Sequence, residues 1–259
     1  MKWRYTIGLV LILLLVSVIL FLPPVNAVSN GDPAFVVDND LNYLPIIAKT
    51  EVAVYFDDFS NPDSGWPISE DDRVHTEYLN DEYRMLTKVA GYLYLLKAPI
   101  VPYETYTVSV DAAWAIEKGS GYGLAFGMNA DIDQFYAFLI SPEFSQYWFM
   151  RGENDDVVIL DFGEIDSGLN MGSNHIQVTR YGSQIQVVVN DDWERSWTDA
   201  SFSGLSYTGL AASTSLDQGL SDIRFDNYLL TSPVFASEPA VEIGIMPSHV
   251  IKVTRFDFP

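Results

Sequence analysis

From Glu51 onward the chain alternates apolar and polar residues in short segments, and Gly, Asn, Asp or Pro separates each segment from the next. A period of two places successive side chains on opposite faces of a β-strand, whereas a helix needs apolar residues three and four positions apart. Almost no segment has the helical spacing, and many short strands joined by turns are typical of an all-β sandwich or barrel. The predicted strands are 52–59, 83–88, 92–97, 103–114, 121–129, 134–140, 145–151, 156–162, 174–181, 184–190, 193–198, 207–213 and 222–231.

The segment 103–114 shows how such a strand divides its side chains. One face would pack in the core and the other would face solvent, because neighbouring side chains point in opposite directions. The segment 135–140 is apolar on both faces, which is typical of a central strand that is covered on both sides. The segment 181–184 has the composition of a hairpin turn. In 103–114 the apolar face would carry Tyr106, Val108, Val110, Ala112 and Trp114, and the polar face Thr105, Thr107, Ser109 and Asp111.

The N-terminus has the pattern of an export signal. Lys2 and Arg4 precede an uncharged run from Tyr5 to Leu22, and Val25-Asn26-Ala27 follows with small residues at its ends. We expect a signal peptide over 1–27 that is cleaved after Ala27, with an uncleaved membrane anchor as the alternative. Either alternative places the rest of the chain outside the cytoplasm, at the cell surface or in the medium.

The exported part divides into three regions. Residues 28–50 mix Asn, Asp, Gly and Pro with short apolar pieces, which indicates a spacer. Residues 51–231 form the predicted β domain, and 232–259 form a tail with four prolines. Two short alternating pieces in that tail, 241–246 and 250–256, would either add edge strands or pack loosely.

Composition excludes several classes of function. The chain has 35 Asp plus Glu against 14 Lys plus Arg, a formal charge of −21, which argues against nucleic acid or an anionic membrane surface as partner. It has no Cys, which excludes disulfides, thiol catalysis and Cys-ligated zinc. With 48% hydrophobic residues it is a folding chain rather than a disordered one.

Several short islands, taken in order, resemble the concanavalin A-like jelly-roll domains related to laminin G modules, to glucanases and to the domain of 3-keto-disaccharide hydrolases. The resemblance covers roughly 52 to 231 and includes exported bacterial proteins. It implies two antiparallel sheets stacked face to face, with a concave face or a loop rim as the ligand surface. The islands are Phe56-Asp57-Asp58-Phe59, Gly65-Trp66-Pro67, Tyr83-Arg84, Gly121-Tyr122-Gly123-Leu124, Phe126, Phe135-Tyr136-Ala137-Phe138, Asn174-His175-Ile176-Gln177-Val178, Gly182-Ser183-Gln184-Ile185, Val189-Asn190-Asp191, Gly209-Leu210-Ala211 and Phe225-Asp226-Asn227.

No catalytic motif of a known kind is complete in this sequence. Glucanases of this fold resemble one another in a strand with Glu-x-Asp followed by a second Glu, and Glu164-Ile165-Asp166 lacks that second Glu. This segment also falls between two predicted strands, so we expect Glu164 in a loop, where a solvated charge is the alternative to catalysis. Neither a Gly-x-Ser-x-Gly elbow nor a phosphate loop occurs. His175 would lie on the solvent-exposed face of its strand, so we interpret it as a solvated polar side chain rather than as a catalytic base.

Calcium is the one cofactor that the composition suggests, because Ca²⁺ takes six to eight oxygen ligands from loops and carboxylates. The last strand of the domain, with Asp226, would pair beside the first, which ends near Asp57 and Asp58. We therefore expect Asp57, Asp58 and Asp226 to be the candidate calcium ligands. Other acidic pairs have the plain interpretation of solubilising charge.

A sugar site needs exposed aromatic rings and polar groups that bind hydroxyls. Trp193 and Trp197 flank charged residues near a turn, which suggests a rim, and Thr105, Thr107, Ser109 and Asp111 would line one sheet face. We expect a non-catalytic exported domain that binds carbohydrate or another extracellular surface ligand. The alternatives are a glycoside hydrolase with a noncanonical carboxylate pair and a structural adhesion module.

Overall fold

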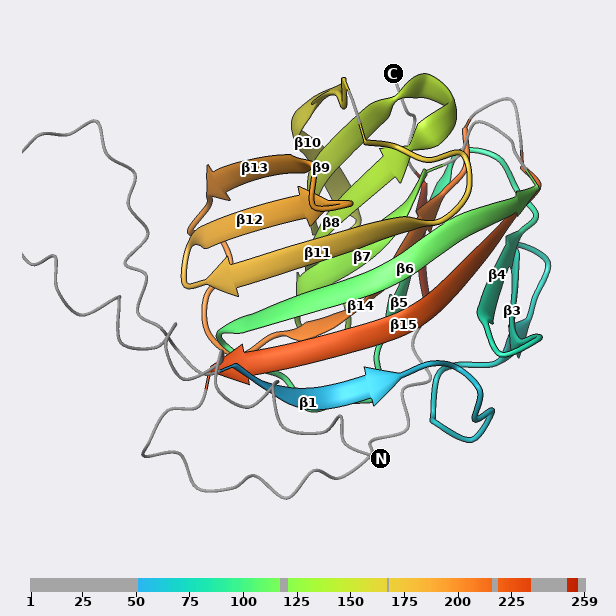
Figure 1. Ribbon diagram of the computed structural model, residues 1–259, viewed down its shortest axis with the longest axis horizontal. Coiled ribbons are helices and arrows are strands. Elements are labelled where there is room, and N and C mark those ends of the chain that lie inside the picture. Colours follow the sequence, from blue (N-terminus) through green and yellow to red (C-terminus); the bar gives the residue numbers. More distant parts are fainter. Residues whose placement is uncertain (1–50, 117–120, 167, 216–218, 234–250, 256–259) are drawn as a thin grey trace, which may run out of the picture. The chain divides into compact units, whose positions relative to one another are not determined.

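The computed structural model describes residues 51–116, 121–166, 168–215, 219–233 and 251–255 (Figure 1). The predicted leader 1–27, the spacer 28–50 and the tail piece 241–246 lie outside these residues. The described part is all-β apart from one 3₁₀ turn, η1 (Pro142–Phe144). Within the described residues, no helix has the length and the apolar character to cross a membrane.

Two antiparallel sheets pack face to face. Sheet A has the order β13-β12-β11-β6-β15-β4-β3-β2, and β1 pairs with the second half of β15. The first half of β15 pairs instead with β4, so this strand changes its neighbour along its length. The strands of sheet A are β1 (Glu51–Asp57), β2 (Ser69–Glu70), β3 (Val74–Tyr78), β4 (Tyr83–Thr87), β6 (Tyr106–Ile116), β11 (Asn174–Tyr181), β12 (Gln184–Val189), β13 (Trp193–Thr198) and β15 (Ser221–Pro233).

Sheet B has the order β10-β9-β8-β7-β14-β5-β16. Its last strand comes from the C-terminal tail and pairs antiparallel with β5, so this part of the tail is an edge strand. The strands of sheet B are β5 (Tyr92–Lys97), β7 (Gly121–Met128), β8 (Gln134–Ser141), β9 (Gln146–Glu153), β10 (Asp156–Glu164), β14 (Tyr207–Ser213) and β16 (Ile251–Arg255).

The main core lies between the two sheets and is rich in aromatic rings. Tyr106, Val108, Val110, Ala112 and Trp114 all contribute to it from β6, as the alternation in this segment predicts. The hairpin between β11 and β12 closes where it is predicted, with Tyr181 opposite Gln184. The all-β sandwich predicted from the sequence is therefore confirmed.

A second apolar cluster covers the outer face of sheet B. Its members are buried although they point away from the main core, which confirms that 135–140 is apolar and covered on both faces. Small residues occupy the middle of this face, and larger ones lie around them. The cluster consists of Leu93, Leu95, Ala125, Met128, Ile132, Phe135, Ala137, Leu139, Trp148, Met150 and Ala211.

This second cluster is enclosed because sheet B coils around its own outer face. Lys252 on the edge strand β16 lies 3.0 Å from Asp155, which belongs to the turn at the other edge, between β9 and β10. Thr254 donates to the Asp155 carbonyl at 3.4 Å, and Lys97 donates to the Ala130 carbonyl at 2.7 Å. The contacts of Lys252 and Thr254 with Asp155 thus join opposite edges of the sheet, and the Lys97 contact joins β5 to the loop between β7 and β8.

The structure contains two strands that the sequence pattern does not predict, and it places one predicted loop residue in a strand. β3 and β2 were not predicted, because His75 and Glu77 alternate with only one aliphatic side chain, Val74, and the pattern reads as polar. Glu164, expected in a loop, is the last residue of β10 and is exposed. Other strand ends differ by a few residues, as is common where strands fray into turns.

Candidate functional site

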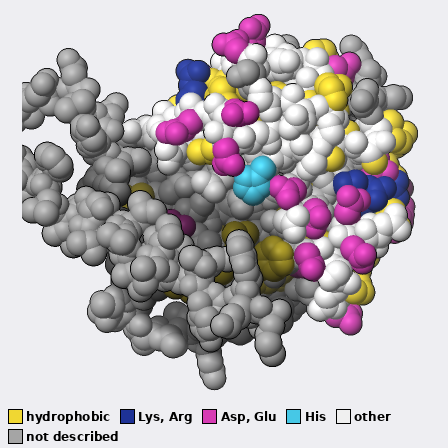
Figure 2. Space-filling model, in the orientation of Figure 1, with side chains coloured by type: hydrophobic (Ala, Val, Ile, Leu, Met, Phe, Trp, Pro, Cys, Tyr) yellow, Lys and Arg dark blue, Asp and Glu magenta, His cyan; other side chains and the backbone are white. Residues whose placement is uncertain are grey.

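The outer face of sheet A carries the polar strip predicted on 103–114. Thr107, Ser109 and Asp111 alternate along β6 with core residues and so lie on the outer face, and Thr105 directly precedes the strand. Figure 2 views this face and shows a histidine side chain with acidic side chains beside it. In contrast to the enclosed outer face of sheet B, this face presents the partly exposed side chains of Thr107 and Asp111 to solvent. Ser109, expected on the solvated face, is buried between them with 5% exposure.

Asp111 is the centre of a hydrogen-bonded group that includes His175 and Asn227, which we call the Asp111 cluster. His175 lies directly opposite Asp111 on β11, and its Nδ1 is 2.7 Å from Oδ1 of Asp111. Asn227 donates from Nδ2 to the other oxygen, Oδ2, at 3.0 Å. An ionised carboxylate only accepts hydrogen bonds, so His175 donates from Nδ1 and its Nε2 stays available to a ligand.

Asp226 lies opposite Asp111 on its other side, on β15. The backbone of β15 is irregular here: the register shifts between Asp226 and Leu229, and Asn227 has a left-handed φ of 53°. Burial raises the pKa of Asp226, the amide of Asn227 opposes this through a 2.7 Å hydrogen bond, and the negative charges of Asp111, Asp58 and Asp81 raise it further. No ion pair to Asp226 occurs among the described residues.

An exposed aromatic side chain, Phe56, lies on the same sheet face as this polar group. Phe56 on β1 is 57% exposed and pairs with Leu229 on β15, which in turn pairs with Ser109 on β6. Cross-strand neighbours share one face of a sheet, so the Phe56 ring lies next to the polar strip. An exposed aromatic ring beside fixed polar groups is the combination that a sugar site needs.

The polar surface continues along β6, away from Asp111. Thr107 and Thr179 are opposite each other on β6 and β11, with their hydroxyl oxygens 3.1 Å apart. Glu51 accepts hydrogen bonds from Thr107 at 3.2 Å and from Thr231 at 2.6 Å. Thr105 uses its backbone carbonyl to accept from Ser232 at 2.9 Å.

The structure separates the three predicted calcium ligands into different environments. Asp57 is buried, and its carboxylate accepts from the Phe59 amide at 2.8 Å and from Trp66 Nε1 and the Tyr55 hydroxyl at 2.9 Å each. Asp58 is exposed and lies close enough to Asp226 for its charge to act on that group.

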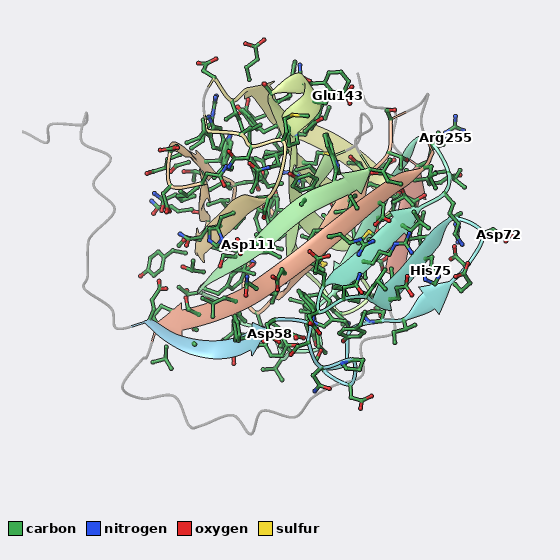
Figure 3. The ribbon with its side chains drawn as sticks, turned by 45° about the vertical axis from the view of Figure 1, so that its right-hand side comes forward. Asp58, Asp72, His75, Asp111, Glu143 and Arg255 are labelled. Carbon is green, nitrogen blue, oxygen red and sulfur yellow. The ribbon has the colours of Figure 1, made fainter. Side chains whose placement is uncertain are left out.

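Figure 3 shows Asp58 beyond the end of β1, Asp111 on β6 and His75 away from both on β3. Among the described residues, no group of three or more His, Cys, Asp and Glu side chains could hold a metal ion. The neutral donors around Asp57 show that it stabilises the end of β1. Calcium binding stays a prediction.

Trp193 and Trp197 do not form the exposed rim that the sequence suggests. Both point inward from β13 and pack against the main core, with ring centroids 4.8 Å apart for Trp193 and Tyr147 and 4.6 Å apart for Trp197 and Phe149. The error arises because the charged neighbours of the two rings lie on an edge strand, where polar residues are common on both faces.

The carboxylate of Asp161 connects β13 to the neighbouring edge of sheet B. Asp161 on β10 accepts from Trp197 Nε1 at 2.8 Å and from the Tyr147 hydroxyl at 3.0 Å, and its carboxylate lies 3.1 Å from Nε of Arg195. Burial, followed by the hydrogen bond to Asp161, raises the pKa of Tyr147 to about 12. These contacts join the edge strands of the two sheets, so the cluster closes the side of the sandwich.

Sequence reasoning missed three members of the site. His175 was placed on the wet face, but nothing in its sequence neighbourhood shows that it lies opposite Asp111. Phe56 belongs to one of the segments that resemble the jelly-roll domains, but its exposure depends on the pairing of β1 with β15. Asn227 reaches Asp111 only because of the irregularity in β15.

Comparison with known proteins supports the fold. No protein-family model matches this chain, and no curated protein matches it. Among solved structures, it is similar to the carbohydrate binding module CBM66 from Bacillus subtilis, with a TM-score of 0.51 and 16% identity over 65% of this chain and 96% of that one. A protein of unknown function with a galectin-like fold, also from Bacillus subtilis, has a TM-score of 0.51 and 7% identity over 72% of this chain and 100% of that one.

A third similar structure is an enzyme. It is the GlcNAcα1-4Gal-releasing endo-β-galactosidase from Clostridium perfringens, with a TM-score of 0.52 and 8% identity over 71% of this chain and 63% of that one. The chain therefore has the concanavalin A-like jelly-roll sandwich fold that the resemblance implies. The similar structures include both a binding module and an enzyme, so fold alone does not separate binding from catalysis.

Proposed function

We propose that this chain is an exported carbohydrate-binding domain whose ligand lies on the outer face of sheet A. The observation that carries the proposal is the exposed Phe56 ring beside the Asp111 cluster on one continuous sheet face. The similar fold of a carbohydrate binding module supports a sugar ligand, and the predicted leader 1–27 supports export.

The chemistry of the face suits a sugar. A pyranose or furanose ring presents C–H groups on one side, which pack on an aromatic ring, and hydroxyls at its edge, which both donate and accept. Asp111 and Asp226 supply acceptors, Asn227 supplies a donor, and Nε2 of His175 accepts from a hydroxyl when Nδ1–H donates to Asp111. The strand positions hold these groups in place. The hydrogen bonds within the Asp111 cluster reduce the entropy that these side chains lose on binding.

The alternative sheet face is less suited to a sugar. The outer face of sheet B is lined by the buried apolar side chains of the second cluster, and its two aromatic rings, Phe135 and Trp148, are buried as well, so these side chains offer neither hydroxyl partners nor an accessible ring. Opening it would expose apolar surface to water at a cost of roughly 25 cal/mol per Å².

Charge narrows the ligand class to neutral sugars. The face carries Asp111, Asp226 and Asp58, and the whole chain has a formal charge of −21. Glycans with uronate or sulfate groups would be repelled at moderate ionic strength. We therefore infer that neutral polysaccharides bind and their carboxylated derivatives do not.

The test is affinity electrophoresis of the purified full chain in gels that contain a soluble β-glucan, xylan, galactan or fructan. A matched pair, hydroxyethyl cellulose and carboxymethyl cellulose, adds the charge comparison. We expect retardation by at least one neutral polysaccharide and none by the carboxymethylated one. Each gel is run with calcium and with chelator, which tests the calcium prediction at the same time.

Variants locate the binding face. Phe56→Ala should weaken binding about tenfold, which corresponds to ~1.4 kcal/mol. Phe144→Ala is the matched control, because Phe144 is 53% exposed but lies in η1, away from sheet A. Equal loss of binding in both variants, or retention of binding in Phe56→Ala, contradicts the placement of the ligand on sheet A. Absence of binding to every polysaccharide contradicts the function itself and favours the adhesion module.

A further inference from the structure

We propose that a cavity at the end of the β9–β10 hairpin binds a free α-amino acid, with Arg151 on its carboxylate and Glu153 and Asp156 on its ammonium group. The cavity has a volume of about 200 Å³ and is lined by Arg151, Glu153, Asn154, Asp156 and Val158. It belongs to sheet B, so this inference goes beyond the glycan binding proposed for sheet A and does not depend on it.

The hairpin brings four of these side chains to one face of sheet B. Arg151 and Glu153 alternate along β9, and Val158 and Asp156 lie directly opposite them on β10. Cross-strand neighbours share one face of a sheet, so the four side chains point to the same side. Asn154 has a left-handed φ of 52° and the next residue one of 73°, which is the conformation of a two-residue turn that matches the twist of the strands. The backbone thus fixes the positions from which the charged groups reach the cavity.

Arg151 is held through one edge of its guanidinium group. Its Nη1 donates to Oδ2 of Asp199 at 2.9 Å and to the hydroxyl of Ser201. Asp199 also accepts from the Tyr136 hydroxyl at 2.8 Å, so the anchor is itself held in place. Arg151 makes no further hydrogen bond to a described residue, which leaves the N–H groups of Nε and Nη2 for a ligand. Nε and Nη2 form one edge of the guanidinium plane, and such an edge binds a carboxylate through two parallel hydrogen bonds.

Opposite charges line the cavity without pairing with each other. No ion pair joins Arg151 to Glu153 or Asp156 in the part of the chain that the structure describes. Glu153 accepts one hydrogen bond, from Nε2 of Gln134 at 3.2 Å, and lies directly opposite Asp156. Two like charges in such positions repel each other, and a positive group between them relieves the repulsion. The cavity therefore suits a ligand with a negative group for Arg151 and a positive group for the two acids.

An α-amino acid meets both requirements in a small molecule, because its carboxylate and its ammonium group are attached to one carbon. At roughly 30 Å³ for each water, the cavity has the volume of about six or seven water molecules, so it accepts a ligand of about that many non-hydrogen atoms, such as alanine. Val158 is 51% exposed and offers an apolar contact to a small side chain. None of the five lining residues is aromatic, so the cavity suits an amino acid better than a sugar ring.

The charge of the whole chain favours the same class of ligand. A small carboxylate without a positive group would be repelled by a chain with a formal charge of −21. A free amino acid has no net charge at neutral pH, so it reaches Arg151 without this penalty. Both of its charged groups are needed, and this requirement can be tested with closely related compounds.

The test is saturation-transfer difference NMR of the full chain with L-alanine at neutral pH, in the presence of chelator so that no calcium ion lies between the acids. We expect alanine signals that saturate on titration. N-acetyl-L-alanine lacks the ammonium group and L-alaninamide lacks the carboxylate, so each should bind about tenfold more weakly or worse. Excess methyl glucoside should not displace L-alanine, because a neutral sugar has neither charge.

Variants locate the site. Glu153→Gln and Asp156→Asn should each weaken alanine binding about fivefold, and the double variant about tenfold or more. Arg151→Lys keeps the charge but loses the bidentate edge, so it should weaken binding about tenfold. Glu143→Gln is the matched control, because Glu143 is exposed in η1, before the other end of β9. Thermal unfolding of each variant confirms the fold, and the two acid variants decide the matter if Arg151→Lys does not fold.

Each outcome supports or overturns the proposal. The absence of alanine signals, equal binding of alanine and its two blocked derivatives, displacement by methyl glucoside, or full affinity in the double acid variant overturns it. Phe56→Ala should bind alanine as the wild type does, because Phe56 belongs to sheet A. A chain that binds alanine but no polysaccharide overturns only the glycan function, and the reverse result overturns only the amino acid site.

Discussion

Lys252 lies with its ammonium 3.0 Å from the carboxylate of Asp155 and 3.4 Å from that of Asp133, although β16 and the β9–β10 turn belong to opposite edges of sheet B. The acids are 82% and 54% exposed, whereas Lys252 is only 12% exposed. The contact shows how far the sheet coils. It also raises the question of whether charge or packing holds the coil closed.

Packing should dominate this closure. Ion pairs with exposed partners contribute ~0–1 kcal/mol, so Lys252→Met, which keeps the apolar stem, should lower the free energy of unfolding by about 1 kcal/mol or less. Leu139→Ala, in the enclosed cluster, should lower it by about 2–5 kcal/mol. Urea unfolding of the two variants measures both values. A larger loss in Lys252→Met than in Leu139→Ala would show that the ion pairs hold the sheet.

Trp193 should matter for stability and not for ligand binding. Its ring packs on Phe138 and Tyr147 at the closed side of the sandwich. Trp193→Ala should therefore lower the free energy of unfolding by about 2 kcal/mol or more, because the core loses a partly buried aromatic ring. Its affinity for the retained polysaccharide should match the wild type. Weaker binding by a folded Trp193→Ala variant would contradict this and would support the binding role that the sequence suggests for Trp193.

Asp222 should make stability depend on pH. Its side chain is 5% exposed and receives Arg84 Nη2 at 2.7 Å and Arg224 Nε at 2.7 Å. Burial alone would raise its pKa, but the hydrogen bonds and charges of Arg224 and Arg84 outweigh burial and hold the pKa below its ordinary value.

A carboxyl whose pKa is lower in the folded state stabilises the protein above the unfolded pKa, and this contribution is lost as the pH falls through the folded pKa. The wild type should therefore lose stability as the pH falls below about 4, the ordinary pKa of an aspartate, and on through the lower pKa that Asp222 has in the folded state. Asp222→Asn should be less stable at neutral pH by about 2 kcal/mol or more and should lose less on acidification. Urea unfolding at several pH values measures this, with Asp63→Asn as the control; parallel pH curves for Asp222→Asn and the wild type would contradict it.

Sequence patterns predict local structure here better than they predict the site. Period-two alternation along 103–114 assigns both faces of β6 correctly, because each side chain's direction follows from its position in the strand. The meeting of Asp111 with His175 depends instead on which strands become neighbours and in which register. Periodicity contains neither piece of information, and strand pairing over long sequence separations is decided by the whole core.

The change of partner along β15 is a second example of what the sequence does not contain. The pairing of the last long strand with the first was predicted, and the structure confirms it in the register of Asp57 with Tyr228. The pairing of the first half of β15 with β4 was not predicted. The left-handed backbone of Asn227 occurs where the neighbour changes, and Asn tolerates this conformation better than most residues.

The coil of sheet B should depend on glycine at one position above all. Gly209 on β14 pairs with Lys97 on β5 and Ala125 on β7. A Cβ added at Gly209 would overlap the carbonyl oxygen of Leu96 on the neighbouring strand, and backbone atoms cannot move aside as the end of a side chain can. Gly209→Ala should therefore open the coil locally and lower the free energy of unfolding by about 2 kcal/mol or more.

Gly172 provides the matched substitution. A Cβ added there meets nothing within 4 Å, so Gly172→Ala should change the free energy of unfolding by about 0.5 kcal/mol or less. Urea unfolding compares the two variants, and hydrogen exchange of β5 and β14 amides shows whether the loss in Gly209→Ala is local. If both substitutions prove neutral, close approach of the strands at Gly209 is not what shapes the sheet, and its curvature arises from the side chains of the enclosed cluster instead.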